Sequence, residues 1–326
     1  MKKNLLICTP LEGIDNTLQR LENLFKISYL PDAKFEDLKN LDERNTEIIF
    51  TNPNRSKVFF GNEVFDLFPK LKIICTASTG TVHIDLVECE RREISIISLK
   101  NEVNFLSQVT STAELAFTMM LTMVRKISPA VHDVYLDNWD CEKFIGKQIQ
   151  DLNIGVLGMG RLGKIFSTYC NAFDPKLSFY DPFVDKSPFP WIEKIENLEE
   201  FLSDLDVLSI HIHATEENYN FIDKDFLKAT KKDICLINTS RGEVINEKDL
   251  VEFMKQYDEF TFATDVLKDE IKNRKNSPIF KYFKEHYPSK KIIITPHIGG
   301  MSEGARNLAY NKAIDLLEEF LNEHKA

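Results

Sequence analysis

The chain has 326 residues, of which 43% are hydrophobic and 28% are charged. This balance is typical of a soluble globular protein, and the length is enough for two domains that each bury a core. The formal net charge of −10 argues against a nucleic-acid partner, because a surface that neutralises phosphates carries an excess of Lys and Arg. No apolar run approaches the length of a membrane span, so no membrane partner is expected.

The chain begins with a short apolar run, Met1 to Thr9, which Pro10 and Glu12 follow at once. This pattern indicates a buried first strand rather than a secretory signal. The six cysteines lie far apart and form no C-x-x-C pair, which predicts small core residues in a reducing cytoplasm and no metal site. They are Cys8, Cys75, Cys89, Cys141, Cys170 and Cys235.

Short apolar strands alternate with amphipathic helices in the first part of the chain. Such apolar strands, separated by helices such as Ile14–Leu24, predict a parallel sheet covered on both faces. The predicted strands are Asn4–Thr9, Glu47–Thr51, Lys72–Ala77 and Ile94–Leu99.

A long helical pattern follows from about Thr112 to Lys126. Ser111 or Thr110 can cap this helix, and Glu114 stands in its first turn. The stretch Ser128–Gln150 is mixed and polar, and with Trp139 it is expected to form a connecting arm.

A second alternating series begins at Asn153. The polar, lysine-rich stretch Lys268–Lys291 is long for one loop and is expected to hold a short helix, Ile279–Glu285. The last predicted helix covers Ser302–Glu323. The predicted strands are Ile154–Leu157, Leu177–Tyr180, Val207–Ile212, Cys235–Asn238, Phe262–Val266 and Ile292–Thr295.

The second series opens with a G-x-G-x-x-G motif, Gly158-Met159-Gly160-Arg161-Leu162-Gly163, directly after a strand and at the start of a helix. That context gives an otherwise weak motif its meaning. Gly158 permits a tight turn, Gly160 lets the backbone approach a pyrophosphate, and Gly163 lets helix and strand pack closely. The helix N-terminus supplies free N–H groups for the anion, so the motif indicates a dinucleotide site.

Asp181 ends the next strand, where a carboxylate is expected to accept hydrogen bonds from the ribose hydroxyls. The residues that follow, Pro182-Phe183-Val184, include no Arg that would pair with a 2′-phosphate. A carboxylate would repel that phosphate, so the sequence favours NAD over NADP.

Three polar residues follow strands of the second series, where ligands bind in such sheets: Arg241, Glu270 and His297. Oxidising a hydroxy acid needs a cation for the carboxylate, a base for the hydroxyl proton and an anion that stabilises the protonated base. These three side chains match those needs. Taken alone, each has a more ordinary explanation as a surface or turn residue, and composition and periodicity do not select them.

The chain resembles the D-isomer-specific 2-hydroxy acid dehydrogenase family, which includes phosphoglycerate dehydrogenase, D-lactate dehydrogenase and glyoxylate/hydroxypyruvate reductase. The resemblance covers nearly the whole chain. Besides the glycine motif, it is carried by Ser78-Thr79-Gly80 with Ile84-Asp85, Ser111-Thr112-Ala113-Glu114, Asn238-Thr239-Ser240-Arg241-Gly242, Asp265-Val266 to Glu270, and Thr295-Pro296-His297-Ile298-Gly299-Gly300.

The resemblance implies roles for these residues. Arg241 would bind the substrate carboxylate and carbonyl, His297 would be the acid/base, and Glu270 would be its partner. Asp265 would hold the nicotinamide carboxamide. The other implied cofactor contacts are Gly158, Gly160, Arg161, Leu162, Gly163, Asp181, His211, Thr215, Thr239, His297, Gly299 and Gly300, and the implied substrate contacts are Asn52, Ser78, Thr79, Gly80 and Arg241.

The chain departs from the family pattern at several positions. Ile271 follows Glu270 where the family usually has Pro, and His213 stands where it often has Pro; His213 is expected to be a satisfied structural residue. Phosphoglycerate dehydrogenases of the family tend to place Arg in the loop after the third strand. Arg55 is the nearest candidate here, so the sequence does not decide whether the substrate is phosphorylated.

The resemblance predicts an α/β protein with two doubly wound parallel-sheet domains and a cleft between them. Residues 1–103 and 299–326 would form a discontinuous, flavodoxin-like substrate domain, and residues 104–298 a Rossmann NAD domain. The expected function is hydride transfer between NAD(H) and C2 of a small D-2-hydroxy or 2-keto acid, such as 3-phosphoglycerate or glycerate/hydroxypyruvate, by a cytoplasmic homodimer. The alternative is an NAD-sensing scaffold of the same fold with little catalysis.

Overall fold

The computed structural model describes residues 2–53, 57–271 and 273–324. The chain forms two compact units. The first combines residues 1–109 with residues 300–326, and the second consists of residues 110–299. The roles and the boundaries that the sequence assigns to two domains stay predictions.

The first unit is built on a sheet of five parallel strands in the order β2-β1-β3-β4-β5, which is the flavodoxin-like order. The edge strand β2 was not predicted from the sequence, because its residues Lys-Ile-Ser-Tyr are half polar. The bounds are β1 Asn4–Ile7, β2 Lys26–Tyr29, β3 Ile48–Thr51, β4 Ile73–Thr76 and β5 Ser95–Ile97.

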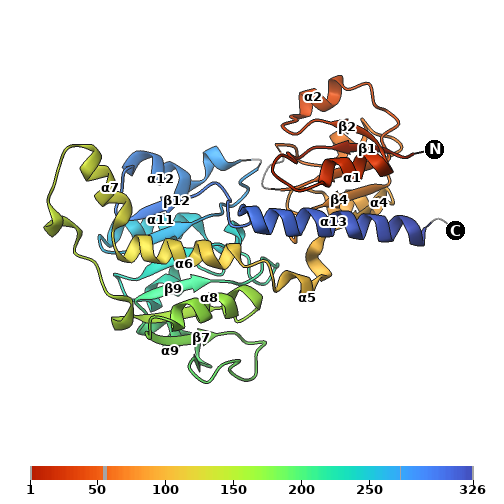
Figure 1. Ribbon diagram of the computed structural model, residues 1–326. Coiled ribbons are helices and arrows are strands. Elements are labelled where there is room, and N and C mark those ends of the chain that lie inside the picture. Colours follow the sequence, from red (N-terminus) through yellow and green to blue (C-terminus); the bar gives the residue numbers. More distant parts are fainter. Residues whose placement is uncertain (1, 54–56, 272, 325–326) are drawn as a thin grey trace. The chain divides into compact units, whose positions relative to one another are not determined.

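Helices cover both faces of this sheet because successive strand residues point to opposite faces. Leu5 and Ile7 of β1 pack with α1 and α13, whereas Leu6 packs in a separate core with α2, α3 and α4. Figure 1 shows α13 beside α1. The bounds are α1 Thr17–Leu24, α2 Phe35–Asn40, α3 Asn62–Phe65, α4 Leu86–Arg91, α5 Val103–Leu106 and α13 Glu303–Glu323, with a 3₁₀ turn at Leu99–Asn101.

The second unit has seven parallel strands in the order β12-β11-β10-β9-β6-β7-β8, a Rossmann-type order that reverses direction at β6. The two-residue edge strand β8 was not predicted. The bounds are β6 Asn153–Leu157, β7 Lys176–Tyr180, β8 Glu193–Lys194, β9 Val207–Ile210, β10 Cys235–Asn238, β11 Thr261–Thr264 and β12 Ile292–Ile294.

This sheet also separates two cores. Ile237 of β10 packs with α6 and α8, whereas its neighbour Leu236 packs with α9, α10, α11 and α12. The helix bounds are α6 Ser111–Val124, α7 Ile127–Tyr135, α8 Arg161–Asn171, α9 Leu198–Ser203, α10 Lys224–Ala229, α11 Glu247–Gln256 and α12 Pro278–His286. Further 3₁₀ turns lie at Cys141–Phe144, Ile149–Asp151, Gly242–Val244 and Arg274–Asn276. The predicted class, α/β with two parallel sheets covered on both faces, is confirmed.

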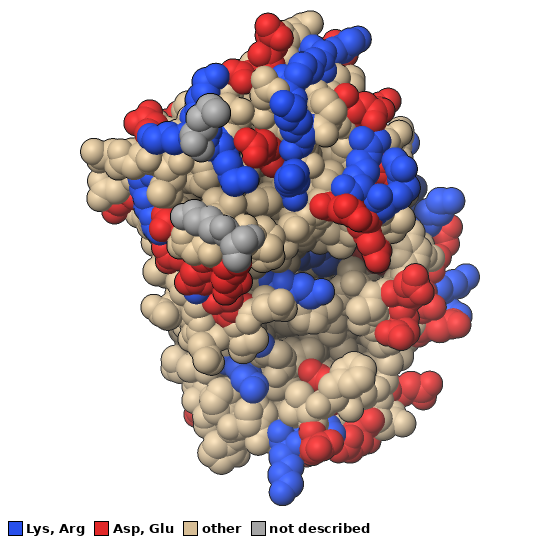
Figure 2. All heavy atoms as spheres, turned by 90° about the vertical axis from the view of Figure 1, so that its right-hand side faces the viewer, with Lys and Arg blue, Asp and Glu red and all other residues tan. Residues whose placement is uncertain are grey.

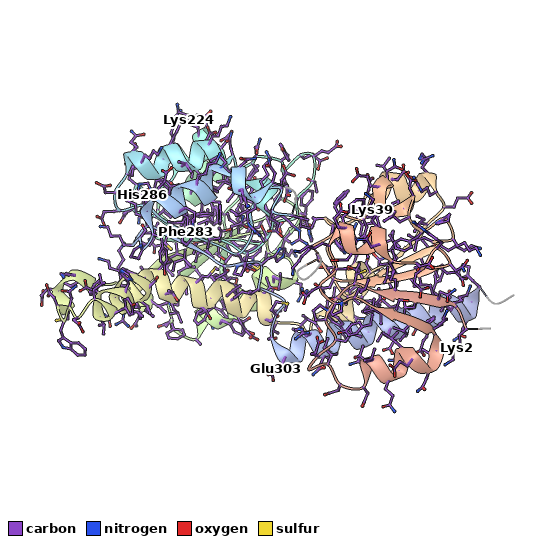
Figure 3. All side chains as sticks on the ribbon, turned by 90° about the horizontal axis from the view of Figure 1, so that it is seen from above. Lys2, Lys39, Lys224, Phe283, His286 and Glu303 are labelled. Atoms are coloured by element: carbon purple, nitrogen blue, oxygen red, sulfur yellow. The ribbon has the colours of Figure 1, made fainter. Side chains whose placement is uncertain are left out.

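Several local predictions need correction. The first helix begins at Thr17 rather than Ile14, because Asn16 takes the left-handed conformation with φ of 55°. Thr110 stands at the N-cap of α6, but its hydroxyl donates to the Glu114 carboxylate and accepts no hydrogen bond from a backbone N–H of the helix. The predicted short helix is present as α12, where Ser277 caps Phe280 N–H; Figure 3 labels Phe283 and His286 on it. Cys141 is exposed rather than part of the core.

The predicted connecting arm contains a helix, α7, directly after α6 (Figure 1). Pro129 falls in its first turn, where a missing N–H costs no hydrogen bond, so the proline does not break the helix. Within the described residues, no helix is long and apolar enough to span a membrane.

Candidate active site

The polar residues singled out in the second unit lie at one edge of its sheet. All strands of this sheet are parallel, so their carboxyl ends share one edge. The loops after β6, β7, β9, β10, β11 and β12 therefore gather the predicted cofactor and catalytic residues at the edge where such folds bind ligands.

The glycine motif after β6 forms a cradle at the start of α8. Gly158 has φ of +94°, and a Cβ there would lie 2.9 Å from the backbone of His211. A Cβ on Gly163 would lie 2.1 Å from the carbonyl oxygen of Gly158, which explains the close packing of helix on strand. A Cβ on Gly160 would meet open space. The backbone at Gly160 thus borders room for a pyrophosphate at the N-terminus of α8, where the N–H groups of the first turn point out of the helix.

Asp181 follows β7 and braces this cradle. One carboxylate oxygen accepts Met159 N–H at 2.8 Å, and the other accepts Phe183 N–H at 2.9 Å. Each carboxylate oxygen has a second lone pair, so hydrogen bonds from ribose hydroxyls remain open to it. The backbone contacts are a role that the sequence hypothesis did not include.

The loop after β9 brings His211 and Thr215 to the same edge. The His211 ring packs inward, with Nε2 2.9 Å from Ser209 Oγ and its centroid 5.2 Å from that of Phe166. Burial lowers the pKa of His211 to about 3, so the ring is neutral at physiological pH. Thr215 is exposed and accepts Asn218 N–H at 3.2 Å. His213 is exposed, contrary to the expectation of a satisfied structural residue.

The loop after β10 is organised by the buried amide of Asn238. Its Oδ1 accepts hydrogen bonds from the backbone and the hydroxyl of Ser240 at 2.9 and 2.8 Å, and its Nδ2 donates to the Arg241 carbonyl at 2.9 Å. Arg241 Nη1 donates to the Ser240 carbonyl at 2.6 Å. Within the described residues the guanidinium has no carboxylate partner, which leaves a cation for an anionic ligand.

His297 and Glu270 form a hydrogen-bonded pair between His297 Nδ1 and Glu270 Oε1. Glu270 Oε2 also accepts Leu267 N–H at 3.2 Å, which fixes the carboxylate. Each side chain is 21% exposed. His297 has φ of 56°, a conformation that costs a non-glycine residue free energy and that is frequent at functional sites.

Asp265, after β11, holds the segment that carries His297. Oδ1 accepts the Thr295 hydroxyl at 2.5 Å and Ile298 N–H at 2.7 Å, and Oδ2 accepts Gly299 N–H at 2.7 Å. Burial raises the pKa of this carboxyl group, and the three donors oppose that effect. One lone pair of Oδ2 remains for the carboxamide that the resemblance assigns to it. The positioning role itself was missed, because residues 30 apart in sequence make these bonds.

Gly242, which belongs to the motif around Arg241, and Glu247 support the Glu270 segment in roles that the sequence hypothesis did not include. A Cβ on Gly242 would lie 2.1 Å from the backbone carbon of Leu267, so only glycine fits beside this segment. Glu247 is 6% exposed and accepts Lys268 N–H at 3.1 Å, and burial raises the pKa of its carboxyl group. The Arg241 and Glu270 segments are therefore packed against each other.

In the first unit, the loop after β4 carries the predicted substrate contacts Ser78, Thr79 and Gly80. Within the described residues, no acceptor is present for the backbone N–H groups of Thr79, Gly80 and Thr81. Such a run of unpaired N–H groups is suited to an anion. Asn52 is 8% exposed and donates to the Ala77 carbonyl at 2.9 Å, so it supports this loop. Arg55 lies outside the described residues.

Across residues 2–53, 57–271 and 273–324, no cluster of three or more His, Cys, Asp or Glu side chains could hold a metal ion. The candidate reacting groups at this sheet edge are Arg241, His297 and Glu270, beside the glycine cradle.

Residues 117–299 match a family model described as D-isomer specific 2-hydroxyacid dehydrogenase, NAD binding domain. The chain is 29% identical over 269 residues to D-3-phosphoglycerate dehydrogenase of Archaeoglobus fulgidus, over 82% of this chain and 48% of that protein. It is 27% identical over 268 residues to the D-3-phosphoglycerate dehydrogenase of Bacillus subtilis, with the same two shares. The chain thus spans about half the length of these relatives.

Among solved structures, D-lactate dehydrogenase from Aquifex aeolicus, complexed with NAD and lactic acid, superposes with a TM-score of 0.79. The two sequences are 24% identical, and the match covers 98% of this chain and 96% of that chain. At this identity the match shows a common fold, which extends over both units.

Proposed function

The chain belongs to the D-isomer specific 2-hydroxyacid dehydrogenase family and carries its NAD-binding domain, and from this premise we propose that it transfers a hydride between NAD(H) and C2 of a small D-2-hydroxy acid or 2-keto acid. The observation that carries the proposal is the hydrogen-bonded His297–Glu270 pair at the same sheet edge as the glycine cradle. A pair of this kind is what proton transfer to a C2 oxygen requires.

In the reduction direction, the Arg241 guanidinium holds the carboxylate and polarises the C2 carbonyl with its forked donors. NADH, when bound, supplies the hydride to C2. His297 donates the proton to the oxygen that becomes the hydroxyl. Because its Nδ1 is engaged by Glu270, Nε2 is the nitrogen that exchanges this proton, and the Glu270 carboxylate stabilises the imidazolium.

The cradle would hold the cofactor pyrophosphate through Gly158, Gly160, Gly163 and the first residues of α8, Arg161 and Leu162. Asp181 would accept the ribose hydroxyls, which favours NAD(H) over NADP(H). The further contacts proposed are His211, Thr215, Thr239, Asp265, His297, Gly299 and Gly300. Gly160 supports this assignment, because a Cβ there would extend into open space and no packing contact requires a glycine.

The substrate carboxylate would also be bound by the loop Ser78-Thr79-Gly80, whose unpaired N–H groups support this role. The relatives of highest similarity reported above are D-3-phosphoglycerate dehydrogenases, which favours 3-phosphoglycerate or the related glycerate/hydroxypyruvate pair as candidates. Side chains near Asn52 and Arg55 would choose between them.

We also propose that the protein is a homodimer in a reducing cytoplasm. The six cysteines are all unpaired, and five are buried, which supports a reducing compartment. The dimer rests on apolar side chains of α7 and the segment after it, which include Trp139 with 90% of its surface exposed.

The test is NADH oxidation by a panel of 2-keto acids, with wild type and His297→Ala. We expect turnover on at least one acid, weaker activity with NADPH, and a loss in kcat of about a hundredfold or more in His297→Ala, the usual contribution of a positioned acid/base. The dissociation constant for NADH should stay within about twofold, because His297 is one of many proposed cofactor contacts and its main contribution is to proton transfer. His286→Ala, an exposed histidine on α12, is the matched control (Figure 3).

Tight NADH binding without turnover on any acid would instead favour an NAD-sensing scaffold. Wild-type turnover in His297→Ala would show that the chain shares the fold and the cofactor of the family but not its chemistry.

A further inference from the structure

His83 is a fully buried histidine beneath the loop after β4. Its exposed fraction is 0%, and burial lowers the pKa of the ring to about 3. Its backbone is fixed by a bridge to the neighbouring segment, where Phe60 N–H donates to the His83 carbonyl and Asp85 N–H donates to the Phe60 carbonyl, both at 2.8 Å. The Phe60 ring meets the imidazole edge-on, with centroids 6.1 Å apart. His83 therefore has one fixed position.

From this position a chain of hydrogen bonds leads to the loop. His83 Nε2 lies 3.3 Å from Thr76 Oγ1, and Thr76 Oγ1 lies 2.9 Å from Ser78 Oγ. Ser78 Oγ donates to the Gly80 carbonyl at 2.7 Å. Thr76 is fully buried at the last position of β4. This series of hydrogen bonds therefore runs from the interior of the unit to its surface loop.

The directions of these bonds follow from the number of protons. A hydroxyl has one proton, and that of Ser78 is used on the Gly80 carbonyl. Ser78 must therefore accept from Thr76, and Thr76, whose proton is then used, must accept from His83. His83 is thus the neutral tautomer with its proton on Nε2. Its other nitrogen, Nδ1, is buried without a partner in the described part of the chain.

This arrangement is unfavourable for stability alone. An unpaired buried nitrogen costs free energy that a leucine of similar volume would not. The histidine instead supplies an N–H donor at the start of the series of hydrogen bonds that ends at the Gly80 carbonyl. The Gly80 carbonyl and the Thr81 N–H belong to the same trans peptide and point in opposite directions. Because the carbonyl points toward Ser78, the Thr81 N–H points away from Ser78.

We propose that His83 is a positioning residue for substrate binding: through Thr76 and Ser78 it holds the Thr79-Gly80-Thr81 backbone with its unpaired N–H groups available to the carboxylate of the 2-keto acid. This inference rests on the proposed function, because the carboxylate is the ligand of that loop only in a 2-hydroxy acid dehydrogenase. It adds Thr81 N–H to the donors of the loop and assigns a role to a residue that touches no substrate.

The first test reads the tautomer without any substrate. Long-range ¹H–¹⁵N NMR spectra of the full chain, labelled in its seven histidines, identify His83 by its absence from His83→Gln. We expect a neutral ring with the proton on Nε2 from about pH 8 down to about pH 5, where exposed histidines are already charged. We call the hydrogen bonds from His83 through Thr76 and Ser78 to the Gly80 carbonyl the relay. A proton on Nδ1, or titration of His83 near the ordinary histidine pKa, overturns the relay.

The second test is kinetic, with the best 2-keto acid of the panel. His83→Leu, Thr76→Val and Ser78→Ala should each raise KM for the keto acid by about tenfold, while kcat falls less and KM for NADH stays within about twofold. The double variant His83→Leu/Ser78→Ala should raise KM no more than the single variant with the larger effect, because both substitutions break the same series of hydrogen bonds. His83→Gln, which returns an N–H donor, should restore most of the affinity.

Two further measurements distinguish an effect on the relay from loss of the fold and from failure of the proposed function. Thermal unfolding of His83→Leu should show a folded protein, and His324→Leu, an exposed histidine of the same unit, should keep the wild-type KM. Wild-type turnover with an unchanged KM in folded His83→Leu overturns the relay alone. No turnover of wild type on any acid overturns the proposed function, and the tautomer measurement still decides the relay.

Discussion

At the candidate site, the Asp265 carboxylate holds the segment that carries His297, besides the cofactor contact proposed for it. Three donors, from Thr295, Ile298 and Gly299, converge on its carboxylate, and they bracket His297 in the sequence. The strained backbone of His297, with its positive φ, is therefore held from both sides. Precision at the proposed acid/base depends on a buried charge that does not take part in the proton transfer.

We expect Asp265→Asn to reduce both turnover and stability. The amide would turn an N–H group toward the N–H of Gly299, now 2.7 Å from Oδ2, and lose that acceptor. Leaving a buried donor unpaired costs about 1–3 kcal/mol. Urea unfolding measures the loss of stability, and steady-state kinetics measure kcat. Asp258→Asn, an exposed carboxylate paired with Lys291, is the control that should change little, and a wild-type kcat in Asp265→Asn would contradict the positioning role.

The cysteines differ in reactivity because they differ in burial. Cys141 is exposed, whereas the other five are buried, and burial raises the pKa of the Cys8 thiol to about 12. We expect one thiol per chain to react quickly with Ellman's reagent at about pH 8, since only an accessible thiolate is reactive. All six should react in denaturant, and Cys141→Ser should abolish the fast phase. Two or more fast thiols in the native wild-type protein would show that a buried strand or helix becomes accessible.

At the scale of elements, the positions of the functional loops are fixed by glycines that pack backbone against backbone. Gly163 brings α8 onto β6, and Gly242 brings the turn after β10 onto the Leu267–Lys268 backbone. Gly160 is different, because the space where its Cβ would lie is open. These glycines therefore separate two requirements, packing of elements and access for a ligand.

Alanine at two of these glycines should give opposite results. Gly242→Ala places a Cβ 2.1 Å from the Leu267 backbone, which must shift together with the support of Glu270. Overpacking of this kind costs about 1–3 kcal/mol or more, and a displaced reacting group lowers kcat. Gly160→Ala should leave the unfolding transition unchanged but weaken NADH binding, measured by fluorescence titration. Equal effects of the two variants on stability, or on NADH affinity, would refute this distinction.

The sequence predicts the elements that its periodicity marks and misses those that depend on tertiary contacts. The strands β6, directly before the glycine motif, and β10, before Arg241, are apolar and buried, so their pattern is unambiguous. The edge strand β2 is half polar, and α7 carries Pro129, so neither pattern is visible. At the site, motifs locate Arg241, Glu270 and His297, but His83, Asn238 and Gly242 act through contacts that only the folded chain creates.

At the scale of the whole molecule, each unit has two cores separated by a sheet, and the chain returns to complete the first unit with α13. Figure 3 labels Glu303 in the first turn of that helix. The net charge of −10 is distributed, because on the face drawn in Figure 2 Lys and Arg side chains lie among Asp and Glu. The proposed anionic substrate would therefore be attracted by local donors such as Arg241 rather than by the field of the protein.

Apolar side chains are gathered on the arm of the second unit. The arm is defined as residues 127–145, and it runs along the outside of that unit (Figures 1 and 3). Val131 is 64%, Tyr135 81% and Trp139 90% exposed, so Trp139 does not pack within its own unit. A patch of aromatic and aliphatic side chains at one place is typical of a protein–protein interface, where Trp and Tyr are enriched.

We therefore expect a homodimer that depends on this arm. Sedimentation equilibrium at about 10 μM should give twice the chain mass of 37.8 kDa, because a stable interface of this kind has a dissociation constant well below that concentration. Val131→Asp and Trp139→Glu place charges among the apolar side chains, and they should shift the protein toward the monomer. Val87→Asp is the matched control, because Val87 is 78% exposed on α4 and belongs to the first unit rather than to the arm. A monomeric wild type at this concentration, or a dimer that survives both arm variants, would contradict the arm as the interface.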